Sequence, residues 1–259
     1  MAPAQCITPS LPFGLFHVVI AAWSFSQNLL ELPESMGLTN AQFFVYRREH
    51  ETIPLRSLPG ACGIQVTERL LLPNHGRDAA AFYDWAAAHR ASPPAAMVFM
   101  HDHAGNSWHS TCRAVSGRTV LYYKELERAG VFDHMVTLTD KAGDRNVTDW
   151  FGGRRRLAEN PPCERALSRH GVSLDTVYFE PRHAEFQSCC AMFIMPGSRL
   201  QKHPLALYVD LLNYVQRAPD NEWSTRQCFE YIIWKLMDNR TLEDRRRRFY
   251  EHADNFANC

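Results

Sequence analysis

A turn, a helix pattern and a strand pattern follow one another in LLPNHGRDAAAFYDWAAAH (residues 71–89) and AMVFMH (residues 96–101). The residues at 73–76 (Pro, Asn, His, Gly) are typical of a turn, and Asp78 places a carboxylate at the positive end of a helix dipole. Apolar side chains at positions 80, 82, 85, 86 and 88 supply apolar surface on a helix over residues 78–89. The apolar run at 96–101 has the length of a strand, so the segment predicts a helix followed by a buried strand.

Three further short runs earlier in the chain have strand character. They are HVVIAA (residues 17–22), QFFVY (residues 42–46) and residues 64–67. Because the runs lack polar alternation, they predict strands that are covered on both faces. Strands that alternate with helical stretches indicate an α/β fold with a mainly parallel central sheet flanked by helices.

The second half of the chain predicts a more helical C-terminal third. We expect a helix over residues 118–129, a long surface loop over 140–162, a strand over 186–195 and a helix over 205–217 after Pro204. A last helix begins at the capping-box sequence of residues 224–227 and continues through Phe229, Ile232, Ile233 and Leu236. For the 205–217 helix, the expected core positions are Leu205, Tyr208, Val209, Leu212 and Val215. One domain over residues 17–240, between an N-terminal tail (1–16) and a polar C-terminal tail (241–259), accounts for these elements.

Composition excludes several classes of protein. The 259 residues carry 28 Lys and Arg against 28 Asp and Glu and are 46% hydrophobic, which argues against a disordered chain and against a nucleic-acid partner. No segment reaches the roughly 18 to 20 consecutive apolar residues of a transmembrane helix. Residues 11–25 lack the positive flank of a signal peptide, because no Lys or Arg precedes Arg47.

The cysteines and sequons leave the compartment open. None of the eight cysteines lies in a CxxC spacing, which argues against a zinc ribbon or a thioredoxin-type site. Glycosylation sequons begin at Asn146 and Asn239, and they suit a protein of the secretory-pathway lumen or the extracellular space. A cytoplasmic location is an equal alternative.

The densest group of ligand-type residues follows the strand at 96–101. Asp102 lies between His101 and His103, and ligands of open α/β sheets bind beyond the carboxyl ends of the strands. Asp102 at a strand end is suited to hold a divalent cation that bridges a diphosphate. Two alternatives remain: the triplet simply caps the strand and starts a turn, or His101, His103 and His109 form a zinc site of the hydrolase type with water as the fourth ligand.

A second group of candidates lies at the start of the predicted helix over 78–89. Asn74, Gly76, Arg77 and Asp78 combine a glycine turn, backbone N–H donors of a helix N-terminus and a guanidinium, which together suit an anion. The alternative is a tight surface turn in which Arg77 pairs with Asp78. Both groups of candidates are expected at the same edge of the sheet.

Four blocks of the sequence resemble one family, the domain of unknown function 3431. They are VVIAAWSFSQNLLEL (residues 18–32), residues 71–109 with the N-x-G-R-D turn, CCAMFIMPGSRLQKHPLALYVDLLNYV (residues 189–215) and CFEYIIWKLMDN (residues 228–239). The blocks occur in the order typical of that family. The resemblance places Glu230 at the position of a glutamate that is followed by an aromatic residue and a tryptophan. It implies the family but no activity.

A wider resemblance links the order of strand, N-x-G-R-D turn, helix and strand to glycosyltransferases of the GT-A type. It implies a nucleotide-diphospho-sugar transferase fold, transfer of a sugar from a nucleotide-sugar donor to a carbohydrate or protein acceptor, and Mn²⁺ or Mg²⁺ at Asp102 with help from His103. This chain has His-Asp-His where that type has Asp-x-Asp, so one carboxylate remains, and the fold without the activity is the alternative.

The same resemblance distributes the other roles. The substrate would be contacted by Asn74, Gly76, Arg77, Asp78, His101, Trp108 and His109. No motif identifies a catalytic base. Glu230 and Glu185 are candidates because an inverting transfer needs a carboxylate or an imidazole to accept the proton of the acceptor hydroxyl, and a structural role in an apolar helix is an equal alternative for Glu230. Two other functions stay open: a zinc-dependent hydrolase built on the three histidines, and a non-catalytic carbohydrate-binding protein in which Trp108 stacks on a sugar.

Overall fold

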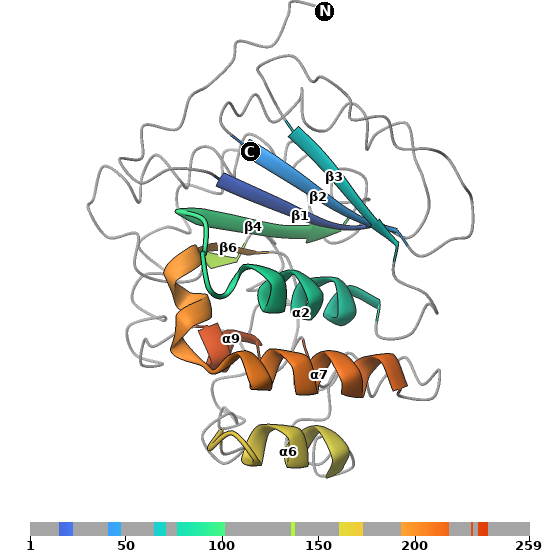
Figure 1. The fold of residues 1–259 in the computed structure, drawn as a ribbon, viewed down its shortest axis with the longest axis vertical. Coiled ribbons are helices and arrows are strands. Elements are labelled where there is room, and N and C mark those ends of the chain that lie inside the picture. The colour runs from blue at the N-terminus through green and yellow to red at the C-terminus, as the bar shows by residue number, and fades with distance from the viewer. Residues whose placement is uncertain are drawn as a thin grey trace, which may run out of the picture.

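The protein is described by a computed structural model in which six strands pair into one sheet and helices cover one of its faces (Figure 1). The described residues are 16–22, 41–47, 65–70, 77–101, 136–137, 161–172, 193–217, 229 and 233–237. Within these ranges, every helix is too short or too polar to cross a membrane.

The sheet is mixed but mostly parallel, as the sequence predicts. Its strand order is β3-β2-β1-β4-β6-β5, in which β1 to β4 run parallel and β6 is antiparallel to both of its neighbours. The strands are β1 (Phe16–Ala22), β2 (Ala41–Arg47), β3 (Gln65–Leu70), β4 (Ala96–His101), β5 (Val136–Thr137) and β6 (Phe193–Pro196).

The central strands β1 and β4 are covered on both faces, which explains their unbroken apolar sequences. Val19 and Phe99 point into the core that the sheet shares with the helices, whereas Val18 and Val98 on the other face are also buried. Successive strand residues point to opposite faces, so a strand buried on both sides needs an apolar residue at every position. The prediction of strands covered on both faces is confirmed for β1 and β4.

Helix α2 (Arg77–His89) lies directly against the sheet and confirms the helix predicted over residues 78–89. Its alanines let the helix approach closely, while Phe82 and Trp85 fill the space beneath the strands. The ring centroid of Phe82 lies 5.7 Å from those of Phe99 and Phe193 and 5.3 Å from that of Phe229. This aromatic core joins α2, β4, β6 and the C-terminal part of the chain.

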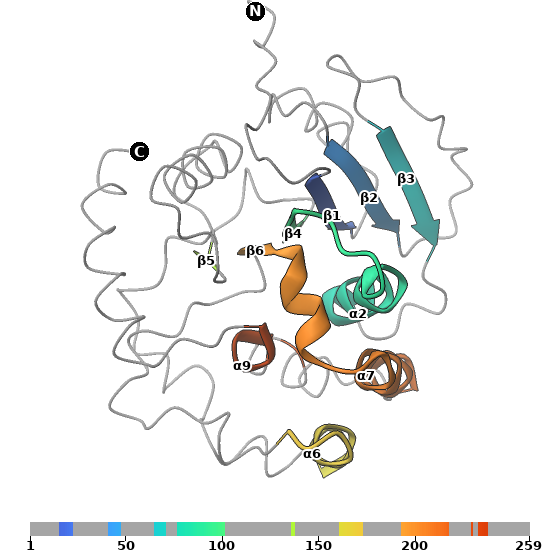
Figure 2. The ribbon, with the colours of Figure 1, turned by 60° about the vertical axis from the view of Figure 1, so that its left-hand side comes forward.

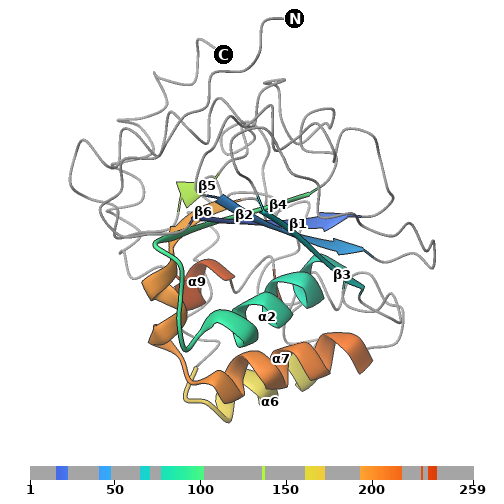
Figure 3. The same ribbon diagram turned by 45° about the horizontal axis from the view of Figure 1, so that its top comes forward.

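Two further helices extend the packing away from the sheet. Figures 2 and 3 show α7 (Leu205–Arg217) against α2, and α6 (Pro161–Ser168) beyond α7. The 3₁₀ helix η4 (Gly197–Lys202) connects β6 to α7, and the short α9 (Ile233–Met237) contacts η4. The hydroxyl of Tyr208 donates to the carbonyl of Leu200 at 3.0 Å and fastens α7 to η4.

The boundaries of α7 are as predicted, but its buried face is different. Leu205 and Val209 were expected in the core and are 47% and 39% exposed. The buried positions are Leu207, Tyr208, Leu211 and Val215. The sequence LALYVDLLNYV has apolar residues on more than one side of the helix. The spacing of apolar residues therefore does not predict which side packs against α2 and α6.

Other predicted elements differ at their ends. The third strand is Gln65–Leu70 instead of residues 64–67, and the loop predicted over 140–162 gives way to α6 at Pro161, where proline is tolerated because a first-turn N–H has no helical partner. Phe229 lies in a turn, and α9 begins at Ile233. The predicted helix over 118–129, residues 186–192 of the predicted strand and the capping box at 224–227 lie outside the described residues.

Candidate functional site

The carboxyl ends of the four parallel strands form one edge of the sheet. We call it the carboxyl edge, and its strand ends are Ala22, Arg47, Leu70 and His101. The chain builds outward from β1 through β2 to β3 and then returns to place β4 on the other side of β1. This reversal is a topological switch point, and ligands of open α/β sheets bind in the crevice beyond it.

His101 occupies the switch point. It is the last residue of β4 and pairs in register with Ala21 of β1, so β4 ends directly beside the carboxyl end of β1. Asp102, the predicted metal ligand, is the next residue in the sequence. Asp102, His103, Trp108 and His109 lie outside the described residues.

The start of α2 lies at the same edge. The chain leaves β3 at Leu70 and enters α2 at Arg77, and α2 then runs back beneath the strands (Figure 1). Its last residue, His89, contacts the amino end of β1, since the rings of His89 and His17 are 5.0 Å apart. The expectation that the N-x-G-R-D turn and His101 share one edge therefore agrees with the elements that flank the turn.

Of the second group of candidates, the structure describes Arg77 and Asp78. Arg77 is the first residue of α2, and Asp78 lies half-buried in its first turn, as predicted from the helix dipole. Asn74 and Gly76 lie outside the described residues, as do the two candidate bases, Glu230 and Glu185. Glu230 directly follows Phe229, whose ring is 5.6 Å from that of Phe99 on β4.

Sequence reasoning missed an arginine at this edge. Arg47 is the last residue of β2 and is 9% exposed, and it pairs in register with Ala22 and Leu70. A guanidinium stays charged at all physiological pH values and is suited to bind phosphate or carboxylate. The signal in the sequence was an arginine that closes an otherwise apolar strand.

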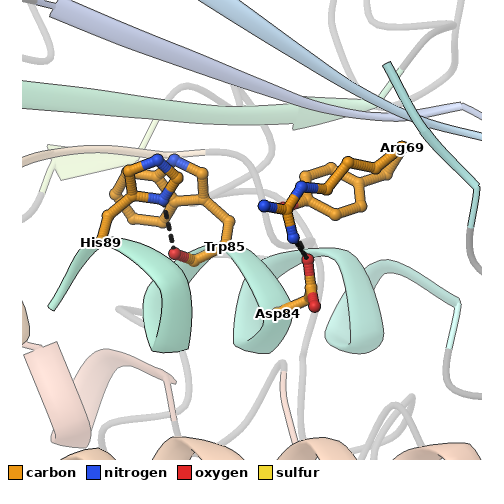
Figure 4. A network of polar contacts seen from close by, with 5 residues as sticks. Arg69, Asp84, Trp85 and His89 are labelled. Carbon is orange, nitrogen blue, oxygen red and sulfur yellow. Dashed lines mark hydrogen bonds and ion pairs between the residues drawn. The ribbon is translucent and has the colours of Figure 1, made fainter. Parts of the chain in front are cut away.

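A polar network fixes α2 to the two outer parallel strands. Asp84 Oδ2 accepts a hydrogen bond from the Tyr46 hydroxyl at 3.0 Å and one from Arg69 Nη1 at 2.8 Å (Figure 4). Burial, and then the charge of Asp84, raise the pKa of Tyr46 far above its ordinary value, so this tyrosine stays a neutral donor. In the sequence, Arg69 precedes the N-x-G-R-D motif and Asp84 follows it, so the network joins the elements on both sides of the motif.

A second group of titratable residues lies at the opposite, amino edge of the sheet. The amino-edge cluster consists of His17 on β1, Phe44 on β2, and Trp85 and His89 on α2. Burial, and then the neighbouring His89, lower the pKa of His17 to about 4. In the sequence, the one sign of this cluster is a histidine at the start of an apolar run.

Among the described residues, no three His, Cys, Asp or Glu side chains gather in a way that could hold a metal ion. The predicted ligands Asp102, His103 and His109 lie outside those residues, so the manganese, magnesium and zinc sites stay predictions. Cys163, which is buried in α6, is disulfide-bonded.

Comparison with known proteins identifies the family. The family described as "Protein of unknown function (DUF3431)" matches residues 63–247, which is more than half of the chain. No curated protein and no solved structure matches the chain. The matched region includes the N-x-G-R-D turn, β4 and the helices α2, α6, α7 and α9, so this chain belongs to the DUF3431 family.

Proposed function

We propose that this chain is a glycosyltransferase with a GT-A-like fold, which binds a nucleotide sugar at the carboxyl edge and transfers the sugar to a carbohydrate or protein acceptor. The observation that carries the proposal is the switch point between β1 and β4, because His101 ends β4 there and Asp102 follows it.

The arrangement at this edge suits a diphosphate. Arg47 ends β2 and Arg77 begins α2, so two guanidinium-bearing residues belong to elements that meet the carboxyl edge. The backbone N–H groups in the first turn of α2 point away from the body of the helix and suit an anion. Asn74 and Gly76 would bring the turn close to the donor, and His101, Trp108 and His109 would line the region around the sugar.

The proposed cation fits a donor set of one carboxylate and one imidazole. Asp102 and His103 would hold Mn²⁺ or Mg²⁺, and water and phosphate oxygens would fill the remaining positions. When bound, the cation would neutralise charge on the departing nucleoside diphosphate. Glu230 would accept the proton of the acceptor hydroxyl, and the contact of Phe229 with Phe99 supports its assignment to the region of β4.

The disulfide at Cys163 supports a lumenal or extracellular location. Disulfides persist in oxidising compartments and are rare in the cytosol. A carbohydrate acceptor and the sequons at Asn146 and Asn239 suit the same compartments.

A thermal-shift screen tests the proposal. The purified chain is heated with UDP-, GDP- and CDP-sugars, each with and without Mn²⁺, because a ligand of the native state raises the melting temperature by mass action. At 100 times its Kd a ligand stabilises by about 2.7 kcal/mol, which corresponds to roughly 5 to 10 °C for a chain of this size. We expect one nucleotide class to give a shift that requires Mn²⁺.

Matched variants assign the shift to the site. Asp102→Asn removes the carboxylate charge and should abolish the part of the shift that depends on the metal. Glu164→Gln changes an exposed carboxylate on α6 in the same way and should leave the shift intact. If no nucleotide sugar shifts the folded protein, the proposal fails; a shift with Zn²⁺ alone that is lost in His101→Ala would indicate the hydrolase. Saturable glycan binding without turnover would indicate the carbohydrate-binding protein.

A further inference from the structure

The amino-edge cluster places the buried imidazole of His17 against the half-buried imidazole of His89, between the sheet and α2. The ring centroid of His17 lies 5.0 Å from that of His89, 4.8 Å from that of Phe44 and 5.9 Å from that of Trp85. His89 stacks on Trp85 at 5.2 Å with an interplanar angle of 22° (Figure 4). His17 is only 4% exposed, so solvent does not hydrate a charge on its ring.

Hydrogen bonding acts on only one of the two imidazoles, and there it raises the pKa of His89 against the larger, lowering effect of burial. His89 Nδ1 donates to the backbone carbonyl of Trp85 at 2.8 Å, because a carbonyl oxygen only accepts. His17 Nδ1 and Trp85 Nε1 are buried and find no hydrogen-bond partner in the described part of the chain. A proton added at His17 Nδ1 would therefore gain no acceptor among the described residues.

The charged groups around the cluster do not supply a counter-ion to His17. On α2 the titratable group that acts on His17 is His89, which carries the same sign of charge when protonated. From β2 the cluster receives the ring of Phe44, and on β4 the register partner of His17 is Met97. Asp84 and Arg69 act on His89 with opposite signs and are paired with each other at 2.8 Å.

We propose that the contact between His17 and His89 is an acid-sensitive latch, which holds the C-terminal half of α2 on the sheet while both imidazoles are neutral and releases it when they are protonated. Two imidazolium ions this close in an aromatic layer would repel each other and would also lose their hydration. The latch is independent of the proposed transferase activity.

The direction of the pH effect follows from linkage. His17 has a pKa of about 4 in the folded state, against an ordinary value of 6.5, so the unfolded chain takes up the proton first as the pH falls. The stabilisation by neutral His17 is complete above pH 6.5 and is lost progressively between about pH 6.5 and pH 4. Over that whole window the unfolding equilibrium constant rises by on the order of 300-fold from His17 alone, and the lowered pKa of His89 adds to it in the same direction.

The test compares the full chain with His17→Phe, which keeps an aromatic ring and removes the titration. Urea unfolding is measured at pH 7.5 and pH 4.5. We expect the unfolding constant of the wild type to rise by on the order of 100-fold more than that of the variant. His170→Gln is the matched control, because it removes an imidazole outside the amino-edge cluster, where His170 Nε2 lies 3.0 Å from Asp210 Oδ2; its amide exchange over residues 84–89 at pH 5 should match that of the wild type.

Two measurements on folded protein separate a local latch from general acid unfolding. At pH 5, amide hydrogen exchange over residues 84–89 should be faster in the wild type than in His17→Phe at the same pH. In an NMR titration of the wild type, one imidazole should stay neutral down to about pH 4. The proposal would be overturned by any one of three results: the same pH dependence of the unfolding constant in wild type and variant, equal amide exchange over residues 84–89, or a His17 resonance that titrates near pH 6.5. The NMR titration uses the wild type alone, so it decides even if the variant does not fold.

Discussion

Substitution of Gly197 by alanine should severely destabilise the protein, because a side chain there would collide with backbone. Gly197 opens η4 directly after β6, and its N–H donates to the carbonyl of Ala95 at 3.2 Å. A Cβ atom on Gly197 would lie 1.9 Å from the carbonyl oxygen of Pro94 and 2.9 Å from the carbonyl carbon. Ordinary contact would require the two segments to separate by more than ~1 Å, which is a large shift for a packed interior.

The expected loss is large because no side-chain rotation relieves the clash. Overpacking of a well-packed interior costs about 1 to 3 kcal/mol and occasionally more, and we expect Gly197→Ala at or above the upper end. The strain falls where β4 and β6 begin to pair, at Ala96 and Pro196. For a domain of this size, a loss of about 3 kcal/mol lowers the melting temperature by roughly 6 to 12 °C.

Urea unfolding of the variant measures the effect as a lower midpoint at an unchanged slope. Gly171→Ala is an informative comparison, since nothing lies within 4 Å of the added atom but the residue has φ +74°. It should cost about 1 to 2 kcal/mol through the left-handed backbone alone. Ser198→Ala, at an exposed position, should cost less than about 0.5 kcal/mol. A Gly197→Ala protein within about 0.5 kcal/mol of wild type would refute the close approach of β6 to the segment before β4.

Three other substitutions test separate features of the structure. Tyr46→Phe removes the hydroxyl that donates to Asp84 at 3.0 Å and should lower the free energy of unfolding by about 1 kcal/mol in urea titrations, whereas no loss would mean that this contact is absent. Leu207→Ala should cost about 2 to 5 kcal/mol and Leu205→Ala less than about 0.5 kcal/mol, because Leu207 is buried and Leu205 is exposed; equal losses would contradict the observed face of the helix. Cys163→Ala should lower the free energy of unfolding by about 2 to 5 kcal/mol under oxidising conditions, because it removes a disulfide. A reductant that acts on this disulfide should then have no further effect on the variant, which unfolding with and without the reductant measures.

The strand and helix order was readable from sequence where one physical signal dominated. A short, continuous apolar run such as residues 96–101 is typical of a buried strand, and these residues form β4. The helix at residues 205–217 was equally clear, since Pro204 marks its start. The buried face of that helix was not readable, because the choice between Leu205 and Leu207 depends on where α2 and α6 lie.

Features that depend on distant contacts were not readable either. Nothing near Gly197 in the sequence indicates that the carbonyl of Pro94 approaches it, and nothing near His17 indicates that His89 will face it. For the candidate site, the apolar run at 96–101 correctly placed His101 at the end of a strand. The register with Ala21, which identifies that end as the switch point, came only from the strand order.

We propose that the edge between the carboxyl ends of β1 and β4 binds a metal and a nucleotide sugar. A crystal structure of the full chain with Mn²⁺ and the nucleotide sugar that gives the largest thermal shift tests it most directly, because the anomalous signal locates the metal. We predict one Mn²⁺ beside Asp102, beyond His101 and Ala22, with the diphosphate extending toward the first turn of α2. A nucleotide sugar and metal bound elsewhere on the protein would contradict the account.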